Sequence, residues 1–270
     1  MNRHRGSQVW RWLLLGVFLL PLGWALAGSV DVAPDARGGW VVDPTLEHYR
    51  EIFGGASGMA SAMTQGLLVG VVAALLAVSI GFLAAVALRQ TRSPWARRTP
   101  AALLLVSLMP PLAYGPALAD EVRLVGLYDS VVGLALAEAG LTAPLAIWIL
   151  TGYLAELPYE VDEAAALDGS TLSRTLWCIL LPAAWRGLVA TLVVVFILCW
   201  NLFTVPSLLA FGSIETVPIV LSSFWTYEKE MDWSTAAAAL VVGMLPAVLA
   251  VAVAQRVLRS FAPLSVDDDW

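Results

Sequence analysis

Long apolar runs separated by short polar segments make up most of this chain. Six of the runs reach the length that a membrane-spanning helix needs, which is about 20 mostly apolar residues. They lie at residues 11–29, 62–88, 100–118, 131–153, 187–210 and 235–257. Prolines inside the runs, including Pro110 and Pro111, are expected to be tolerated because neighbouring helices can satisfy the freed backbone groups. The pattern predicts an all-α integral membrane protein with six transmembrane helices.

A polar island at residues 155–186 separates the fourth run from the fifth. Leu157-Pro158 predicts the end of the fourth helix, because proline cannot continue a helix and restrains the residue before it. A short helix is expected next, since the acidic residues at 160, 162 and 163 suit the positive end of a helix dipole.

The second half of the polar island predicts a turn and another short helix. Gly169 can adopt the left-handed conformation that ends a helix. Ser170 or Thr171 can then cap a second amphipathic helix over about 171–180. We expect Pro182 to end that helix, which leaves two short helices joined by a sharp bend.

The composition agrees with a membrane protein. The chain has 270 residues, of which 59% are hydrophobic and only 13% charged, and its mean hydropathy is +0.79. A soluble domain is nearer a quarter charged. The two cysteines, Cys178 and Cys199, are not expected to form a disulfide, given their predicted side and depth.

The basic residues predict the orientation of the chain, because cytoplasmic loops are enriched in Arg and Lys. One set of connecting segments holds eleven of them and the other set holds four. The eleven are Arg3, Arg5, Arg11, Arg89, Arg92, Arg97, Arg98, Arg174, Arg186, Arg256 and Arg259; the four are Arg37, Arg50, Arg123 and Lys229. The polar island and both termini are therefore expected in the cytoplasm.

This orientation divides the chain into five parts. Residues 1–10 form a cytoplasmic N-terminus, 11–29 a first transmembrane anchor, and 30–61 an external loop with a short surface helix near 45–53. A five-helix core follows at 62–257, and 258–270 form a cytoplasmic tail whose acidic end is expected to be solvated. The N-terminal segment has a second interpretation, because its arginines, apolar run and Ala25-Leu26-Ala27 also fit a cleaved signal peptide.

Several kinds of chemistry have no support in the chain. A Walker A motif needs Gly-Lys-Ser/Thr, whereas Lys229, the only lysine, follows Glu228. Two His and two Cys give too few ligands for a usual zinc site. We therefore predict a protein that is not an enzyme, that holds no cofactor or metal of its own and that binds lipid but no nucleic acid. Its energy must come from a partner.

One motif in the polar island resembles a known element. Glu163-Ala164-Ala165 is followed after three residues by Gly169, after nine more by Ile179, and after one more by Leu181-Pro182. This spacing resembles the EAA loop of the membrane permeases of ATP-binding-cassette importers. The resemblance implies that the short helix docks on a separate ATPase, which binds ATP and Mg²⁺. The alternative is an ordinary solvated connector between two spans.

Roles for the motif residues follow from that resemblance alone. Glu163 and Gly169 are the residues expected to fix the contact with the ATPase. Supporting members of the motif are Ala164, Ala165, Ile179, Leu181 and Pro182.

A wider resemblance covers most of the chain. Six spans, an N-terminal anchor and an external loop ending near Tyr49 look like the carbohydrate (maltose-type) class of binding-protein-dependent permeases, which implies the type I importer fold. Trp200-Asn201 resembles a Trp-Asn pair of that class, although Leu202 replaces the acidic residue that often follows it.

The same resemblance implies partners and a compartment. The partners are a second homologous permease subunit in a heterodimer, two ATPase subunits and an extracytoplasmic substrate-binding protein. The compartment is the bacterial or archaeal cytoplasmic (inner) membrane.

Candidates for a substrate pathway are the polar and aromatic residues inside the runs, since ionisable groups in a membrane are often functional. Glu138 and Asn201 are the polar candidates, and Trp200, Tyr114 and Phe203 could stack on a sugar. Each has an alternative: Glu138 could reach water, Asn201 could hydrogen-bond between helices, and the aromatic residues could pack or lie in an interfacial belt.

Two other functions stay open at this point. The same kind of importer could carry an amino acid, polyamine or phosphonate. An ion-coupled carrier that runs without ATP would instead need several buried charged residues along a pathway, and only Glu138 is a serious candidate.

Overall fold

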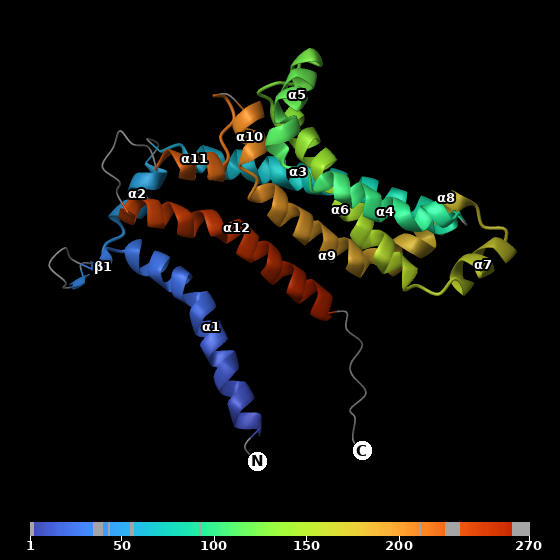
Figure 1. Ribbon diagram of the computed structural model, residues 1–270, viewed down its shortest axis with the longest axis horizontal. Helices are drawn as coiled ribbons and strands as arrows, with labels where there is room; N and C mark the ends of the chain where they lie inside the picture. Colours follow the sequence, from blue (N-terminus) through green and yellow to red (C-terminus); the bar gives the residue numbers. More distant parts are fainter. Residues whose placement is uncertain are drawn as a thin grey trace. The chain divides into compact units, whose positions relative to one another are not determined.

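The computed structural model describes residues 3–34, 40–42, 44–54, 57–91, 93–210, 212–224 and 233–260. Over these ranges the chain is helical apart from one short β-hairpin (Figure 1). The helices long and apolar enough to cross a membrane are Met59–Gln90, Val131–Ala155, Leu172–Trp200 and Trp233–Arg259. A shorter apolar stretch, Gly16–Gly28, lies in the first helix. The predicted runs at 62–88, 131–153 and 235–257 each fall inside one long helix, so these three helices are confirmed.

The first of two compact units comprises residues 1–63 and 216–245. It contains α1 (Arg3–Gly28), β1 (Val32–Pro34), β2 (Trp40–Val42), α2 (Glu47–Phe53), α11 (Val217–Ser223) and the beginnings of α3 (Met59–Gln90) and α12 (Trp233–Ser260). The two strands are antiparallel, with Val32 opposite Val42. Helix α2 confirms the surface helix expected near 45–53, and it buries Ile52 completely.

Hydrogen bonds of His48 join three segments of this unit. Its Nε2 lies 2.9 Å from Oδ2 of Asp31, just beyond α1, and its Nδ1 lies 2.9 Å from Oγ1 of Thr235 near the start of α12. The Thr235 hydroxyl also donates to Oε2 of Glu51 at 3.1 Å. The end of α1, the helix α2 and the beginning of α12 are thereby tied together.

The second unit comprises residues 64–215 and 246–270. It contains most of α3, then α4 (Pro94–Ser107), α5 (Pro111–Leu124), α6 (Val131–Ala155), α7 (Glu160–Leu167), α8 (Leu172–Thr175), a π-helical turn (Leu176–Leu180), α9 (Leu181–Trp200), α10 (Thr204–Leu209) and the end of α12.

Helix α6 is the centre of the second unit. The hydroxyl of Ser130 caps its first turn by accepting the N–H of Gly133 at 3.0 Å. Both α4 and α9 pack along it (Figure 1). Small residues permit this close packing, because a methyl group at Gly187 of α9 would lie 2.6 Å from the ring of Tyr153 on α6.

The prediction of one continuous helix over 100–118 is wrong. Helix α4 ends at Ser107 and α5 begins at Pro111. The reason is the pair Pro110-Pro111, since two successive prolines remove two backbone donors and clash with the preceding turn. Single prolines inside other runs, such as Pro144 in α6 and Pro246 in α12, do not end their helices.

The helix predicted over 187–210 also ends early. Helix α9 stops at Trp200, and α10 is a separate helix that begins at Thr204. The Asn201 side chain explains the end: its backbone N–H makes the last helical bond to the carbonyl of Ile197 at 3.2 Å, and its side-chain amide also donates to that oxygen at 2.8 Å. A polar side chain that bonds the local backbone competes with continuation of the helix.

Candidate functional site

The first helix of the polar island is α7. Its first turn is acidic, and Glu163 and Ala164 are exposed whereas Ala165 is buried. Pro158 precedes the helix as predicted, so α6 ends at Ala155. The short helix therefore presents the Glu163 carboxylate and the Ala164 methyl to the surroundings.

The turn after α7 depends on the backbone of Gly169. Its φ is +67°, in the left-handed region, and a Cβ there would meet open space. The N–H of Ser170 reaches back to the carbonyl of Ala165 at 2.9 Å, which is the closing bond of a Schellman-type helix end. Glycine is needed here for its conformation and not for lack of room.

The second half of the polar island differs from the prediction. Thr171, one of the two residues proposed as a cap, accepts the N–H of Arg174. Helix α8 then continues through the π-helical turn directly into α9, so the expectation that Pro182 ends a separate helix is wrong. The π turn explains this, because the N–H of Leu181 bonds the carbonyl of Leu176, five residues back. The local register no longer requires the donor that proline lacks.

The structure divides the motif residues between two places. Glu163, Ala164, Ala165 and Gly169 belong to α7 and its closing turn. Ile179 lies on the π turn, and Leu181 and Pro182 open α9; Ile179 and Leu181 are half-buried, whereas Pro182 is exposed.

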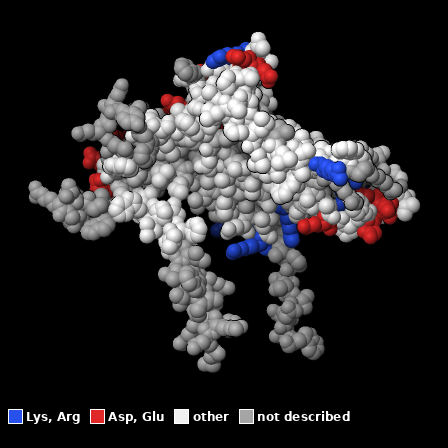
Figure 2. All heavy atoms as spheres, viewed as in Figure 1, with Lys and Arg blue, Asp and Glu red and all other residues white. Residues whose placement is uncertain are grey.

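Large apolar side chains project from this polar segment. Leu167 is 89% exposed, and Trp177, Leu172 and Tyr159 are also more than half exposed. Leu167 is the last residue of α7, and its side chain lies in the open. Figure 2 shows acidic side chains gathered over the α7 end of the second unit, beside basic ones. An apolar residue within such a charged segment is the signal that could have identified Leu167 and Trp177 in the sequence.

The structural role of Arg89 was also not predicted from the sequence. It was counted only among the basic residues that set the orientation. Its side chain is 3% exposed and forms an ion pair of 2.7 Å with Asp162 of α7.

The substrate-pathway candidates fall into different environments. Glu138 is 1% exposed, so the alternative in which it reaches water is wrong for the described chain. Asn201 is exposed, and among the described residues its side chain bonds the carbonyl of Ile197 in its own helix. Trp200 is buried and stacks on Phe196 with ring centroids 6.1 Å apart. Phe203 is exposed and Tyr114 half-buried.

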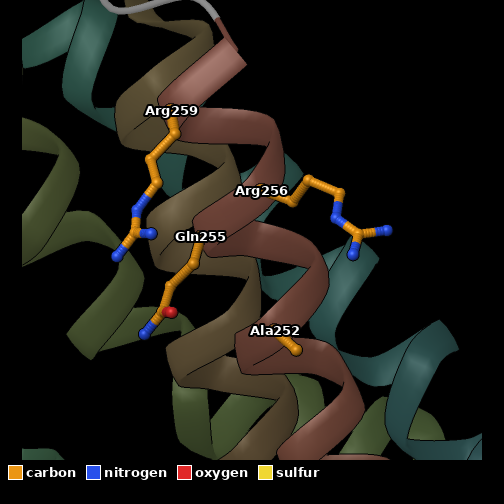
Figure 3. A pocket seen from close by; sticks show the side chains of 4 residues that line it. All are labelled: Ala252, Gln255, Arg256 and Arg259. Atoms are coloured by element: carbon orange, nitrogen blue, oxygen red, sulfur yellow. The ribbon is translucent and has the colours of Figure 1, made fainter.

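A surface hollow of about 460 Å³ lies at the end of α12. Its lining residues are Ala252, Gln255, Arg256 and Arg259. All four come from one helix, and the two arginines point to opposite sides of it (Figure 3). The hollow is therefore an open helix surface and not an enclosed binding site.

A family model matches residues 66–261, which cover most of the chain and both halves of the motif. Its description is "binding-protein-dependent transport system inner membrane component". The chain belongs to this family. Together with the four long apolar helices, this membership shows a multi-pass membrane protein that serves as a transport subunit and not as a catalytic enzyme.

Individual members of the binding-protein-dependent transport family are also similar. The trehalose transport system permease protein SugB of Mycobacterium tuberculosis is 30% identical over 249 residues, 90% of each chain. The trehalose/maltose transport system permease protein MalG of Thermococcus litoralis is 27% identical and spans 92% of this chain and 91% of its own.

A solved structure shares the fold. It is a chain of a bacterial ABC transporter involved in the import of the acidic polysaccharide alginate, with a TM-score of 0.75 over 95% of this chain and 98% of that chain, at 18% identity. The fold of an ABC importer permease is thereby confirmed.

Proposed function

We propose that this chain is the transmembrane permease subunit of an ATP-driven, binding-protein-dependent importer for a sugar or oligosaccharide. Membership of the transport family supports the importer class. The names of SugB and MalG, which state trehalose and maltose transport, support a carbohydrate cargo. These relatives do not favour the alternative of an amino acid, polyamine or phosphonate, nor that of an ATP-independent carrier.

The proposed arrangement has six spans with both termini in the cytoplasm. The long helices of the structure supply four of them. Helix α1 supplies the first, and the broken pair α4 and α5 supplies the third. The excess of basic residues on one side supports the orientation, which places the polar island in the cytoplasm.

Helix α7 and its closing turn are proposed to dock on a separate ATPase. The observation that carries this proposal is the exposure of Leu167 and Trp177 in a segment too charged to lie in lipid. Tyr159 and Leu172 of the same short segment are also more than half exposed, and several large apolar side chains exposed together mark a surface for a protein partner. Glu163 and Gly169 keep their proposed roles, the first as a contact and the second as the source of the bend.

The complete importer is proposed to contain a second homologous permease, two ATPases and an extracytoplasmic substrate-binding protein. The ATPases bind ATP and Mg²⁺ and close on binding. Their motion reaches the spans through α7, and the permease pair alternates between outward-facing and inward-facing states. The substrate-pathway candidates keep their proposed role, and two of them, Asn201 and Phe203, are exposed; the full set is Glu138, Asn201, Trp200, Tyr114 and Phe203.

Co-purification with a co-expressed candidate ATPase tests the docking site. We expect the tagged wild type to recover the ATPase, and Glu163→Arg and Gly169→Pro to lose it while remaining folded. Glu121→Arg is the matched control, since Glu121 is an exposed acidic residue on α5, outside the polar island. Absence of an ATPase with the wild type, or its retention by both α7 variants, would contradict the proposal.

A further inference from the structure

Arg89 holds three consecutive parts of the chain with one side chain. It lies in the last turn of α3, and its Nε and Nη2 each lie 2.7 Å from Oδ2 of Asp162 in α7. Nη2 also donates to the carbonyls of Leu157 and Pro158, at 3.1 and 3.0 Å. Nη1 donates to the carbonyl of Leu154, at the end of α6.

The ring of Tyr159 completes the enclosure of this side chain. The guanidinium carbon of Arg89 stands 4.4 Å from the centroid of that ring, a distance at which a cation and an aromatic face attract. Because the Arg89 side chain is 3% exposed, nearly all of its surface faces protein. A basic residue that served only to orient the chain in the membrane would stay in contact with water or lipid headgroups.

Proline explains why a cation is needed at this place. In an unbroken helix the carbonyl of Leu154 would accept the N–H of residue 158, but Pro158 has none. The backbone offers only three-residue bonds here, from the N–H of Leu157 to Leu154 at 3.2 Å and from the N–H of Val161 to Pro158 at 3.4 Å, so Arg89 adds donors to these carbonyls. Arginine can satisfy them and a carboxylate at once, because its planar guanidinium offers five N–H donors in a fixed fork.

The Asp162 carboxylate depends on Arg89 in turn. Its second oxygen, Oδ1, is buried and has no hydrogen-bond partner among the described residues. The charge of Asp162 is therefore balanced by Arg89 through one oxygen. Removing one member of this pair, in which the arginine is 3% and the carboxylate 24% exposed, leaves the other charge without its partner in a partly buried place, which is unfavourable.

We propose that Arg89 is the positioning residue that fixes α7 to the end of α3, so that the two move as one body when an ATPase acts on α7. This inference rests on the proposed function for its mechanical meaning. Helix α7 has only 8 residues, too few to be rigid alone. Without the contacts between Arg89 and Asp162, which we call the clamp, α7 would be attached only through the turns on either side of it. Those turns would then absorb its motion. Arg89 directs that motion into α3, the longest apolar helix among the described residues.

The test measures the distance between α3 and α7 in the assembled importer. Spin labels are placed at Gln90→Cys and Glu160→Cys, both exposed, in a background with Cys178→Ser and Cys199→Ala. Electron paramagnetic resonance then compares the complex in lipid nanodiscs without nucleotide and with ATP plus EDTA. We expect the wild type to give one narrow distance distribution that ATP does not change.

Arg89→Lys and Asp162→Ala should broaden that distribution and make it respond to ATP. Lysine keeps the charge but cannot bond the carboxylate and three carbonyls together. Arg98→Lys is the matched control, because Arg98 is exposed on α4, and it should behave as the wild type. The two clamp variants, Arg89→Lys and Asp162→Ala, alter the same contact from its two members. If one of them aggregates, the other alone is sufficient for the test.

Two results would overturn the inference: a wild-type distribution that changes with ATP, or a narrow, unresponsive one in a folded clamp variant. Failure of the proposed function gives a different result, since no ATPase would then bind the wild type. In that case the same distance measurement on the chain alone in nanodiscs still tests whether Arg89 fixes α7. A narrow distribution in the wild type and a broad one in Arg89→Lys would support the clamp, and equal widths would refute it.

Discussion

Gly81 sets how closely α3 approaches α6. A methyl group at this position would lie 2.8 Å from Cβ and 2.9 Å from the carbonyl carbon of Ala146. Because one of these atoms belongs to the backbone of α6, a rotamer change cannot relieve the clash. We expect Gly81→Ala to lower the free energy of unfolding by about 1–3 kcal/mol, the usual cost of overpacking. Thermal unfolding in detergent would measure it.

Gly152→Ala provides the control for this residue. It adds the same methyl group to α6 at a position where nothing lies within 4 Å. Alanine is the better helix former by roughly 1 kcal/mol, so this variant should unfold at the wild-type temperature or above it. Equal unfolding temperatures for the two variants would mean that α3 and α6 are not packed closely at Gly81.

Single residues also show where sequence reading works. The turn at Gly169 was predictable because Asp168-Gly169-Ser170 is a local signal, and the observed φ of +67° agrees with it. The role of Arg89 was not predictable, since the carbonyl of Leu154 and the carboxylate of Asp162 lie 65 and 73 residues away in the chain. Local patterns carry no information about such partners.

Among the elements, α2 is held in place by hydrogen bonds of His48, which join it to Asp31 just beyond α1 and to Thr235 of α12. Hydrogen bonds from Ser234 and from His48 hold the pKa of Asp31 below its usual value of 3.8. The charged carboxylate is thus favoured in the folded state. Its contribution to stability is complete above 3.8 and disappears as the pH falls through the lower folded-state pKa.

This pH dependence gives a second prediction. Asp31→Asn should unfold at a lower temperature than the wild type at neutral pH. The difference should persist down to the usual Asp value of 3.8 and shrink only below it. Glu121→Gln, which changes an exposed carboxyl on α5, should show no such difference. If the difference in unfolding temperature between Asp31→Asn and the wild type already disappears at a pH well above 3.8, this account is wrong.

The elements were predictable where the hydrophobic pattern alone decides them. The runs that became α3, α6 and α12 needed only length and apolarity. To predict the break between α4 and α5, the pair Pro110-Pro111 would have to count for more than the apolar run around it. The continuation past Pro182 depends on a π turn, and no residue pattern in the sequence marks that turn.

For the whole molecule, the family match begins at residue 66 and so leaves out α1, the hairpin and α2. The family match thus covers the part from within α3 to the end of α12, whereas the similarity to SugB spans 90% of this chain. The hydrogen bonds from His48 to Thr235 tie this additional N-terminal segment to α12, which lies within the match. Apolar burial accompanies this polar contact, since Ile52 of α2 is completely buried.

The proposed orientation of the whole chain can be tested with its own cysteines. Cys178 is exposed on the polar island, whereas Cys199 is buried in α9. If the polar island is cytoplasmic, a membrane-impermeant maleimide should label the chain, expressed without an ATPase, in inside-out vesicles but not in spheroplasts. Cys178→Ser should abolish that labelling, because the remaining thiol is inaccessible.

The opposite side needs a reporter of its own. Glu121 is exposed on α5, which the charge distribution places outside. In the Cys178→Ser background, Glu121→Cys should therefore be labelled in spheroplasts and protected in sealed inside-out vesicles. Labelling of Cys178 from outside would show that the chain has the opposite orientation. The polar island would then lie where a cytoplasmic ATPase cannot reach it. Since eleven basic residues against four favour the cytoplasmic side, such a result would also mean that the charge bias does not control insertion here.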